Sequence, residues 1–196
     1  TPLISDPGYK LVQDCHINKI KITHAPGPSS VINGLILSGL PTNQFFFGGF
    51  IHPKKNLKKK QFSITKNNVM TGVWFDTCLR LKDTLEIMLE IFGNRKISIA
   101  RELTKTHEEI IFSDLMSIKE LINKRENNNE PLKGELVLIL EGFNKINDID
   151  FETLSFKIKN KLKTNSLRDT VNKIVIETEL PKNLVYNQAM KIKKIT

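Results

Sequence analysis

The chain alternates short apolar segments with segments of helical spacing, and this alternation restricts its fold more than any other feature. We predict strands at residues 19–24, 45–50, 69–76, 96–100 and 135–140. Between them, helical spacing is found at residues 29–40, 80–92 and 115–124. Strands separated by helices are typical of an α/β domain whose sheet is covered on its faces. The glycine pair inside the strand at 45–50 (FFFGGF) predicts a bulge there.

The pattern changes after residue 143. The segment 144–150 (NKINDID) has the composition of a linker, and apolar residues beyond it recur at helical spacing. We predict one helix around residues 167–175, a break at 179–181 that contains a proline, and a second helix at 184–194. These make a small helical module, for which a helix-turn-helix variant is one arrangement.

The chain is basic, and its positive charge is unevenly distributed. It has 30 Lys and Arg against 21 Asp and Glu among 196 residues, a formal net charge of +9. Residues 151–196 hold 10 basic and 4 acidic side chains, and a predicted loop at 52–60 holds Lys54, Lys55, Lys58, Lys59 and Lys60. Such clusters attract polyanions by neutralising phosphates and releasing counterions. The alternative is a solvated face without a ligand.

Several classes of protein are not indicated. No run of about 18 apolar residues is present that would predict a membrane-spanning helix. Cys15 and Cys78 form no CxxC pair, which argues against a disulfide scaffold or zinc cluster and fits a reducing cytosol. No signal peptide follows Thr1, and we expect the chain to begin inside a larger protein.

Three loops have unusual composition. The first is TPLISDPG at 1–8, a proline-rich turn that presents backbone groups at fixed positions. The second is PGPSS at 26–30, which lies between a predicted strand and a helix, where α/β folds bind ligands; alternatively it is only a turn with a helix cap. The third is RELTKTHEE at 101–109, which is either charge beside a cleft or a capping box formed by Thr106 and Glu109.

Six motifs occur in a fixed order: TPLISDPG, PGPSS, SGLP at 38–41, RELTK at 101–105, a following His-Glu-Glu, and KGE at 133–135. Together they resemble the tetrapyrrole methylase superfamily, and within it the bacterial methyltransferases of small-subunit ribosomal RNA. The resemblance implies two α/β domains with S-adenosylmethionine (SAM) in the cleft between them. It also implies a cytoplasmic homodimer that methylates the ribose 2′-hydroxyl of a cytidine in the decoding region of 16S rRNA, without a membrane partner.

The resemblance also assigns roles to individual residues. The cofactor-binding residues it implies are Thr1, Ile4, Ser29, Ser30, Phe75, Leu103 and Gly134. Asp76 is the first candidate for a catalytic or orienting acid, and Glu102 is the second. Because a ribose hydroxyl is a poor nucleophile, a nearby proton acceptor aids its methylation. The implied RNA contacts are Lys54, Lys55, Lys58, Lys59, Lys60 and Arg80, and no metal is expected.

The sequence departs from the family pattern in two ways. Leu79 stands where the family commonly has a histidine before the arginine, and the chain begins within the family's first-domain loop. We therefore expect residues 1–27 to be the end of an N-terminal α/β domain, 28–145 a C-terminal α/β methylase domain, and 146–196 a basic helical module. Two alternatives stay open: an RNA-binding or ribosome-associating remnant without catalysis, and a tetrapyrrole-type methylase with a substrate other than RNA.

Overall fold

The computed structural model describes residues 1–144, 151–178 and 180–195. The chain divides into two compact units, Thr1–Phe143 and Asn144–Thr196, and each is described by itself. Apart from residue 144, the predicted linker lies outside the described residues.

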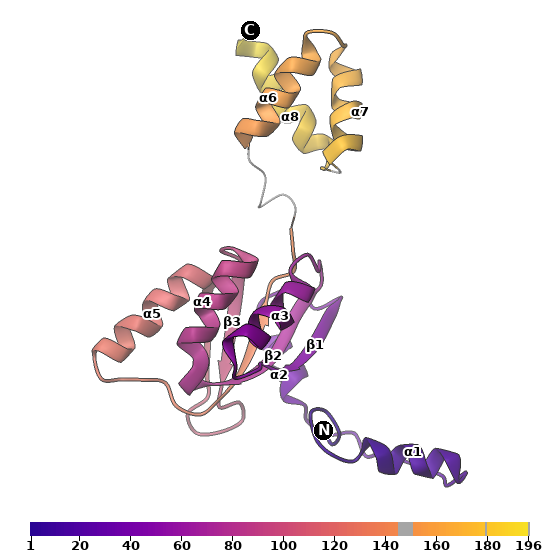
Figure 1. The fold of residues 1–196 in the computed structure, drawn as a ribbon, viewed down its shortest axis with the longest axis vertical. Coiled ribbons are helices and arrows are strands. Elements are labelled where there is room, and N and C mark those ends of the chain that lie inside the picture. The colour runs from indigo at the N-terminus through magenta and orange to yellow at the C-terminus, as the bar shows by residue number, and fades with distance from the viewer. Residues whose placement is uncertain (145–150, 179, 196) are drawn as a thin grey trace. The chain divides into compact units, whose positions relative to one another are not determined.

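The first unit is built on a sheet (Figure 1). Its five strands have the order β1-β2-β5-β3-β4. Its strands are β1 (Phe45–Phe50), β2 (Thr71–Thr77), β3 (Lys96–Arg101), β4 (Glu109–Asp114) and β5 (Glu135–Leu140). β1 pairs parallel with β2, whereas β5 is antiparallel to both β2 and β3. The strands β1, β2 and β3 therefore run in the same direction, and their carboxyl ends lie at one edge of the sheet.

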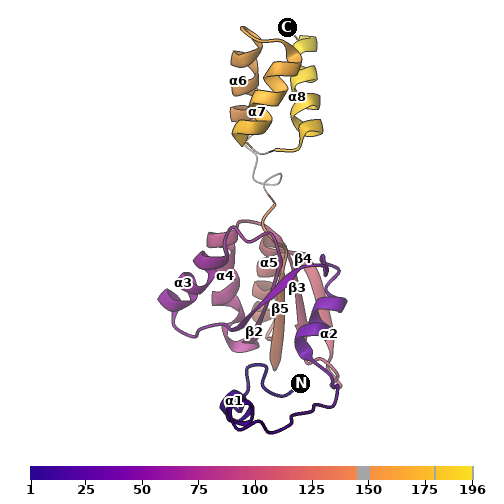
Figure 2. The same cartoon turned by 90° about the vertical axis from the view of Figure 1, so that its right-hand side faces the viewer.

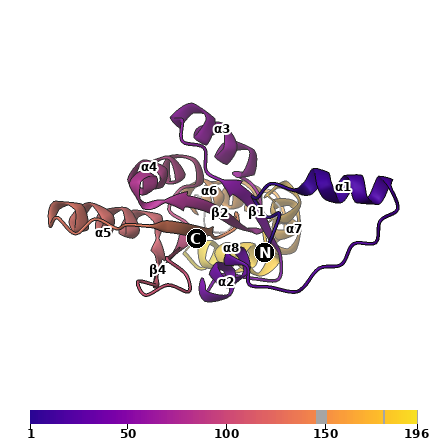
Figure 3. The same cartoon turned by 90° about the horizontal axis from the view of Figure 1, so that it is seen from below.

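Helices cover the two faces of this sheet unequally. Figures 2 and 3 show α3 (Lys55–Thr65) and α4 (Leu81–Phe92) across the sheet from α2 (Ser30–Leu37). α5 (Leu115–Asn127) packs beside α4. Successive side chains of β2 alternate between the faces, so Trp74 joins the core under α3, α4 and α5 while Val73 joins the core under α2. The alternating arrangement of strands and helices confirms the predicted α/β class.

The glycine pair of β1 forms the predicted bulge. The pairing register with β2 shifts between Phe47 and Phe50. Gly49 has a φ of +71°, which glycine adopts without strain, and a Cβ at Gly48 would collide with the indole of Trp74. The bulge lets the backbone of β1 lie directly against a large buried ring.

Several local interpretations of the sequence in this unit are wrong. Residues 19–24 form no strand but follow α1 (Tyr9–Ile17) as exposed irregular chain, because no neighbouring strand offers them hydrogen bonds. The capping box that was one of two alternatives at Thr106 does not form, since Glu109 begins β4, a strand that we did not predict. Glu109 instead binds Arg125 at 2.6 Å and Arg101 at 3.2 Å, which fixes the β3–β4 hairpin.

The predicted lysine loop at 52–60 is also wrong, because most of it belongs to helix α3. Lys and Gln favour helices, and no proline follows Pro53 in this segment. Lys58 and Phe62, one turn apart, are 2% and 0% exposed. A lysine thus occupies a buried position that an apolar residue would normally fill. Because of this lysine, the segment lacks the apolar spacing that would have predicted an amphipathic helix.

The described residues of the second unit form three helices, one more than we predicted: α6 (Phe151–Leu162), α7 (Leu167–Thr178) and α8 (Lys182–Ile195). Their shared core contains Leu154, Ile158, Val171, Ile174, Leu180, Val185 and Ala189. α6 is weakly marked in the sequence because lysines alternate with its apolar residues. Within the described residues of both units, no helix has the length and apolarity needed to cross a membrane.

Candidate active site

A cavity of about 180 Å³ opens at the edge of the sheet where β1, β2 and β3 end and β5 begins. The residues that line it are Ser30, Phe50, Phe75, Asp76, Thr77, Ala100, Glu102, Leu103, Lys105, Glu135, Leu136 and Val137. The carboxyl ends of strands are where α/β sheets bind ligands. The walls are mostly apolar, and the charged groups lie at the strand ends.

The structure brings five of the predicted site residues to this cavity: Ser30, Phe75, Asp76, Glu102 and Leu103. They come from α2, the end of β2 and the turn after β3, segments far apart in the sequence. Sequence reasoning missed the lining residues Phe50, Thr77, Ala100, Lys105, Glu135, Leu136 and Val137. Most of these lie at a strand end, and that position is the signal that could have found them.

Other predicted cofactor residues do not line the cavity. The ammonium group and hydroxyl of Thr1 donate hydrogen bonds to the carbonyl oxygen of Pro28, at 2.7 and 2.8 Å. Ile4 is 45% exposed, and Ser29 immediately precedes α2 without a side-chain cap hydrogen bond. These residues therefore stay predictions without support from the cavity's geometry.

Gly134 acts on the site through its neighbour Glu102. It has a φ of +102°, and a Cβ at this position would overlap the Glu102 carboxyl group. That carboxyl group accepts hydrogen bonds through Oε1 from the Glu135 backbone N–H at 3.0 Å and from Lys105 Nζ at 3.1 Å. These two donors, the backbone N–H first, lower the pKa of Glu102, so it is ionised at neutral pH.

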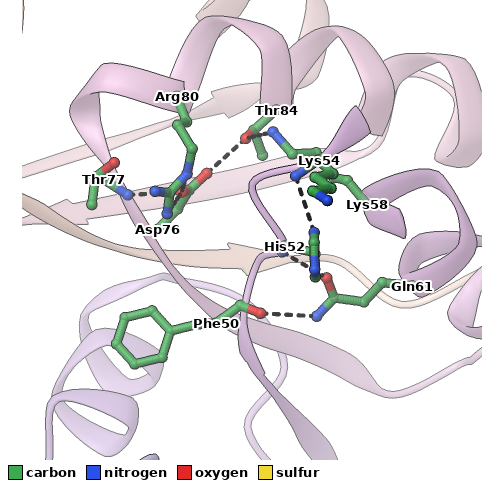
Figure 4. Close-up of polar contacts among 9 residues, drawn as sticks. All are labelled: Phe50, His52, Lys54, Lys58, Gln61, Asp76, Thr77, Arg80 and Thr84. Atoms are coloured by element: carbon green, nitrogen blue, oxygen red, sulfur yellow. Dashed lines mark hydrogen bonds and ion pairs between the residues drawn. The ribbon is translucent and has the colours of Figure 1, made fainter. Parts of the chain in front are cut away.

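Asp76 is held by a ring of donors (Figure 4). Its side chain is buried, and Oδ1 accepts from the Thr77 backbone N–H at 2.8 Å and from Arg80 Nε at 3.0 Å. Arg80 Nη2 lies 2.7 Å from the same oxygen. Oδ2 accepts from the hydroxyl of Thr84, on α4, at 2.6 Å. Both carboxylate oxygens are therefore engaged within the protein, which suits orientation better than proton abstraction.

The network extends from Asp76 to a buried lysine on α3. Lys58 Nζ donates to the Thr84 hydroxyl at 2.8 Å (Figure 4). Burial lowers the pKa of Lys58, while the charges of Asp76 and Asp83 act in the opposite direction. The structure thus contradicts Lys58 as an RNA contact, because its side chain is enclosed and already bound.

The other predicted RNA contacts lie at the surface. Lys54, Lys55 and Lys60 are exposed, whereas Lys59 is partly covered and pairs with Glu90 at 2.6 Å. Arg80 keeps 32% of its side chain exposed beside Asp76. Lys55 and Lys60 of α3, and Lys54 at its N-cap, are therefore exposed to solvent.

Gln61 connects the basic helix to the wall of the cavity. Its amide nitrogen donates to the carbonyl oxygens of Gly48 at 3.1 Å and Phe50 at 3.2 Å, as Figure 4 shows for Phe50. Its amide oxygen accepts from the His52 backbone N–H at 3.1 Å. These bonds fix the end of β1, and with it the Phe50 wall, against α3.

The turn after Asp76 contains no nucleophile suited to neutral pH. Burial raises the pKa of the Cys78 thiol to about 11, so it stays protonated. Leu79, at the position of the family histidine, is 98% exposed. The functional groups of this turn are therefore the Asp76–Arg80 ion pair and the exposed apolar side chain of Leu79.

Comparison with known proteins finds ribosomal RNA methyltransferases among the relatives of this chain. Ribosomal RNA small subunit methyltransferase I of Rickettsia prowazekii is 49% identical over 142 residues, which are 72% of this chain and 49% of that protein. The protein of the same name from Buchnera aphidicola is 35% identical over 192 residues, 97% of this chain and 65% of that protein. The chain is a homologue of these methyltransferases. No protein-family model matches it.

The homologous region is a part of each relative. The chain spans from about half to about two thirds of the length of the curated relatives it matches. Among solved structures, the methyltransferase CobJ covers 72% of this chain with a TM-score of 0.51 and 15% sequence identity, over 61% of its own length. At this identity the likeness shows the fold alone, and it confirms the α/β fold expected from the resemblance to tetrapyrrole methylases.

Proposed function

We propose that this chain belongs to a SAM-dependent methyltransferase that acts on the ribose 2′-hydroxyl of a cytidine in the decoding region of 16S rRNA. One observation carries the proposal: residues implied by the methylase motifs, from three separate segments, line a single cavity at the carboxyl ends of the strands. The homology to ribosomal RNA methyltransferases supports RNA as the substrate class.

The lining residues fit the proposed cofactor. Methyltransferases of this family use SAM, which supplies an electrophilic methyl group on a sulfonium. Phe50, Phe75 and Leu103 offer apolar surface to its adenine ring, and Ser30 offers a hydroxyl. The Thr77 hydroxyl is buried and has no hydrogen-bond partner within the described residues, so a ligand group would satisfy it.

The two acids take different roles in this proposal. The ionised carboxylate of Glu102 faces the cavity and is the candidate acceptor for the ribose hydroxyl proton. Asp76 is a positioning residue, because its oxygens hold Arg80, Thr77 and Thr84 in place. Arg80 then presents a fixed guanidinium group, which suits an RNA phosphate at the edge of the site.

We expect the 196-residue chain on its own to bind SAM weakly, with a dissociation constant of about 1 mM or higher. Its cavity of about 180 Å³ is smaller than the roughly 300–1,000 Å³ of small-molecule sites, so most of the ligand surface would stay in water. Isothermal titration calorimetry with SAM measures this affinity. Micromolar binding of SAM by the chain alone would contradict the interpretation that its cavity is only part of the cofactor site.

The exposed lysines of α3 and of its N-cap are expected to bind RNA phosphates. Changing Lys54, Lys55 and Lys60 together to Gln should weaken rRNA binding and reduce the log–log salt slope by about 2–3, at roughly 0.7–0.9 per contact. Filter binding over a series of salt concentrations measures the slope. SAM affinity should not change, because these side chains do not line the cavity.

Three basic residues of α1 and the following segment, Lys10, Lys19 and Lys21, provide a control of equal charge. Their combined change to Gln removes the same net charge from an exposed region outside α3. An equal loss of slope in both triple variants would show that total charge, and not the α3 surface, governs RNA binding.

The experiment that tests the proposed function is a methylation assay. The natural gene product that contains this chain is incubated with 30S subunits and radiolabelled SAM, and the label is then mapped within 16S rRNA. We expect label on one cytidine ribose and its loss in Glu102→Gln. SAM binding without transfer to RNA would favour a methylase with another substrate, and an absence of SAM binding would favour the RNA-binding remnant. Analytical ultracentrifugation of the same protein tests the expected homodimer.

A further inference from the structure

A second cavity, of about 350 Å³, lies within the C-terminal unit, between the end of α6, the start of α7 and the last turns of α8. The residues that line it are Lys159, Leu162, Lys163, Asn165, Ser166, Leu167, Ile192 and Lys193. Its volume falls within the range of small-molecule sites, unlike that of the sheet-edge cavity. No motif of the sequence and no part of the proposed chemistry uses it.

The rim of this cavity is strongly cationic. Lys159, Lys163 and Lys193 are exposed, and none of them makes an ion pair with a described residue. Two other lysines of α6 behave differently, since Lys157 and Lys161 both bind Glu177, at 3.0 and 2.8 Å. The positive charge of α6 is therefore partly compensated beside α7, whereas the lysines around the cavity have no such acidic partner among the described residues.

The lining contains no acidic residue. One acid, Asp169, contacts the lining: its carboxylate accepts a hydrogen bond at 2.6 Å from the hydroxyl of the lining residue Ser166. A fourth lysine, Lys173, donates to the side-chain oxygen of Asn165. The lining residues that carry a charge are consequently all lysines.

The floor of the cavity is apolar and fixed in place. Leu162, Leu167 and Ile192 are partly buried and pack against the core of the three helices. Such a floor suits a flat, weakly polar group, whereas the rim suits an anion. A nucleotide unites these two properties, with a flat base whose face can cover apolar surface and a phosphate that binds lysine.

We propose that this cavity binds one nucleotide of single-stranded RNA, with its base on the apolar floor and its flanking phosphates on Lys159, Lys163 and Lys193. The proposal rests on the proposed function, in which the substrate is ribosomal RNA. A single strand is required because a base held in a helical stack cannot enter a cavity. The site would hold the RNA through a part of the chain that does not carry the methylation chemistry.

The first test compares two double variants in the 196-residue chain. Lys159→Gln with Lys163→Gln removes two lysines of the rim, and Lys182→Gln with Lys191→Gln removes two exposed lysines that do not line the cavity. With a fluorescent oligoribonucleotide of eight cytidines, the rim variant should reduce the log–log salt slope by about 1.4, at roughly 0.7 per contact on single strands. The control should change it by less than half as much. Equal log–log salt slopes for the rim variant and the control variant would overturn the proposal that RNA binds at this cavity.

The second test asks whether the base enters the cavity. An oligomer of the same length with abasic ribose units should bind the unmodified chain roughly tenfold more weakly, because apolar surface then stays unfilled. The rim variant should discriminate less between the two oligomers. Equal affinity for both would overturn the base-binding part and leave only attraction between charges. Circular dichroism checks that the variants keep their helices.

These results are separable from the proposed function. If 30S methylation occurs and the rim variant behaves like its control, the cavity proposal fails while the function stands. If the oligomer results appear and no methylation is found, the proposed reaction fails while the RNA site stands.

Discussion

Replacing Asp76 with alanine is expected to lower the free energy of unfolding by about 3–5 kcal/mol, the usual effect of removing one partner from a buried charge pair. The Asp76 side chain is fully buried, and its two oxygens receive Arg80, Thr84 and the Thr77 backbone N–H. Alanine would leave these donors without an acceptor, and it would remove the carboxylate whose charge most favours the Lys58 ammonium group. Urea denaturation followed by circular dichroism measures the change.

A double-mutant cycle separates the network from the loss of volume. Lys58→Met keeps the length of the side chain and removes its charge, so the Asp76→Ala change should be less destabilising in that background. Asp76→Asn keeps the size of the side chain and should destabilise less than alanine does. A loss below about 1 kcal/mol for Asp76→Ala would show that the network does not stabilise the fold.

The second large effect is expected at Gly134, where alanine should destabilise the chain by about 2–5 kcal/mol. Its φ of +102° disfavours any residue with a Cβ, by roughly 1–2 kcal/mol. The added methyl group would also meet the Glu102 carboxyl group, and such overpacking typically destabilises by a further 1–3 kcal/mol. Relief requires Glu102 to move away from the Glu135 N–H, so the acid of the site is displaced as well.

Gly39 provides the matched control. It also has a positive φ, of +71°, yet a Cβ there would meet nothing within 4 Å. Gly39→Ala should therefore show the backbone contribution alone, about 1–2 kcal/mol. Thermal unfolding of both variants measures the difference. If the two glycines respond equally, the contact between Gly134 and Glu102 is not a constraint on the site.

The sequence by itself determined the features that depend on neighbouring residues. The strands at 45–50 and 135–140 have the bounds predicted from their apolar runs. The predicted helix at 80–92 corresponds to α4, which ends before Gly93 as predicted, and this glycine has a φ of +71°. The methylase motifs also selected five residues that line one cavity, among them Phe75 and Glu102. Short-range periodicity and the order of motifs depend only on the order of residues along the chain, so they can be recognised without knowledge of the fold.

Only the tertiary structure decided which polar groups are enclosed and what they bind. Lys58 looks like its neighbours in a lysine-rich segment, and its burial depends on Thr84 and Asp76, which lie 26 and 18 positions further along the chain. β4 exists because β3 offers it a partner, whereas residues 19–24 have the alternation of a strand and no such partner. The free energy of a buried charge or a paired strand comes from contacts between distant segments, and no local pattern records them.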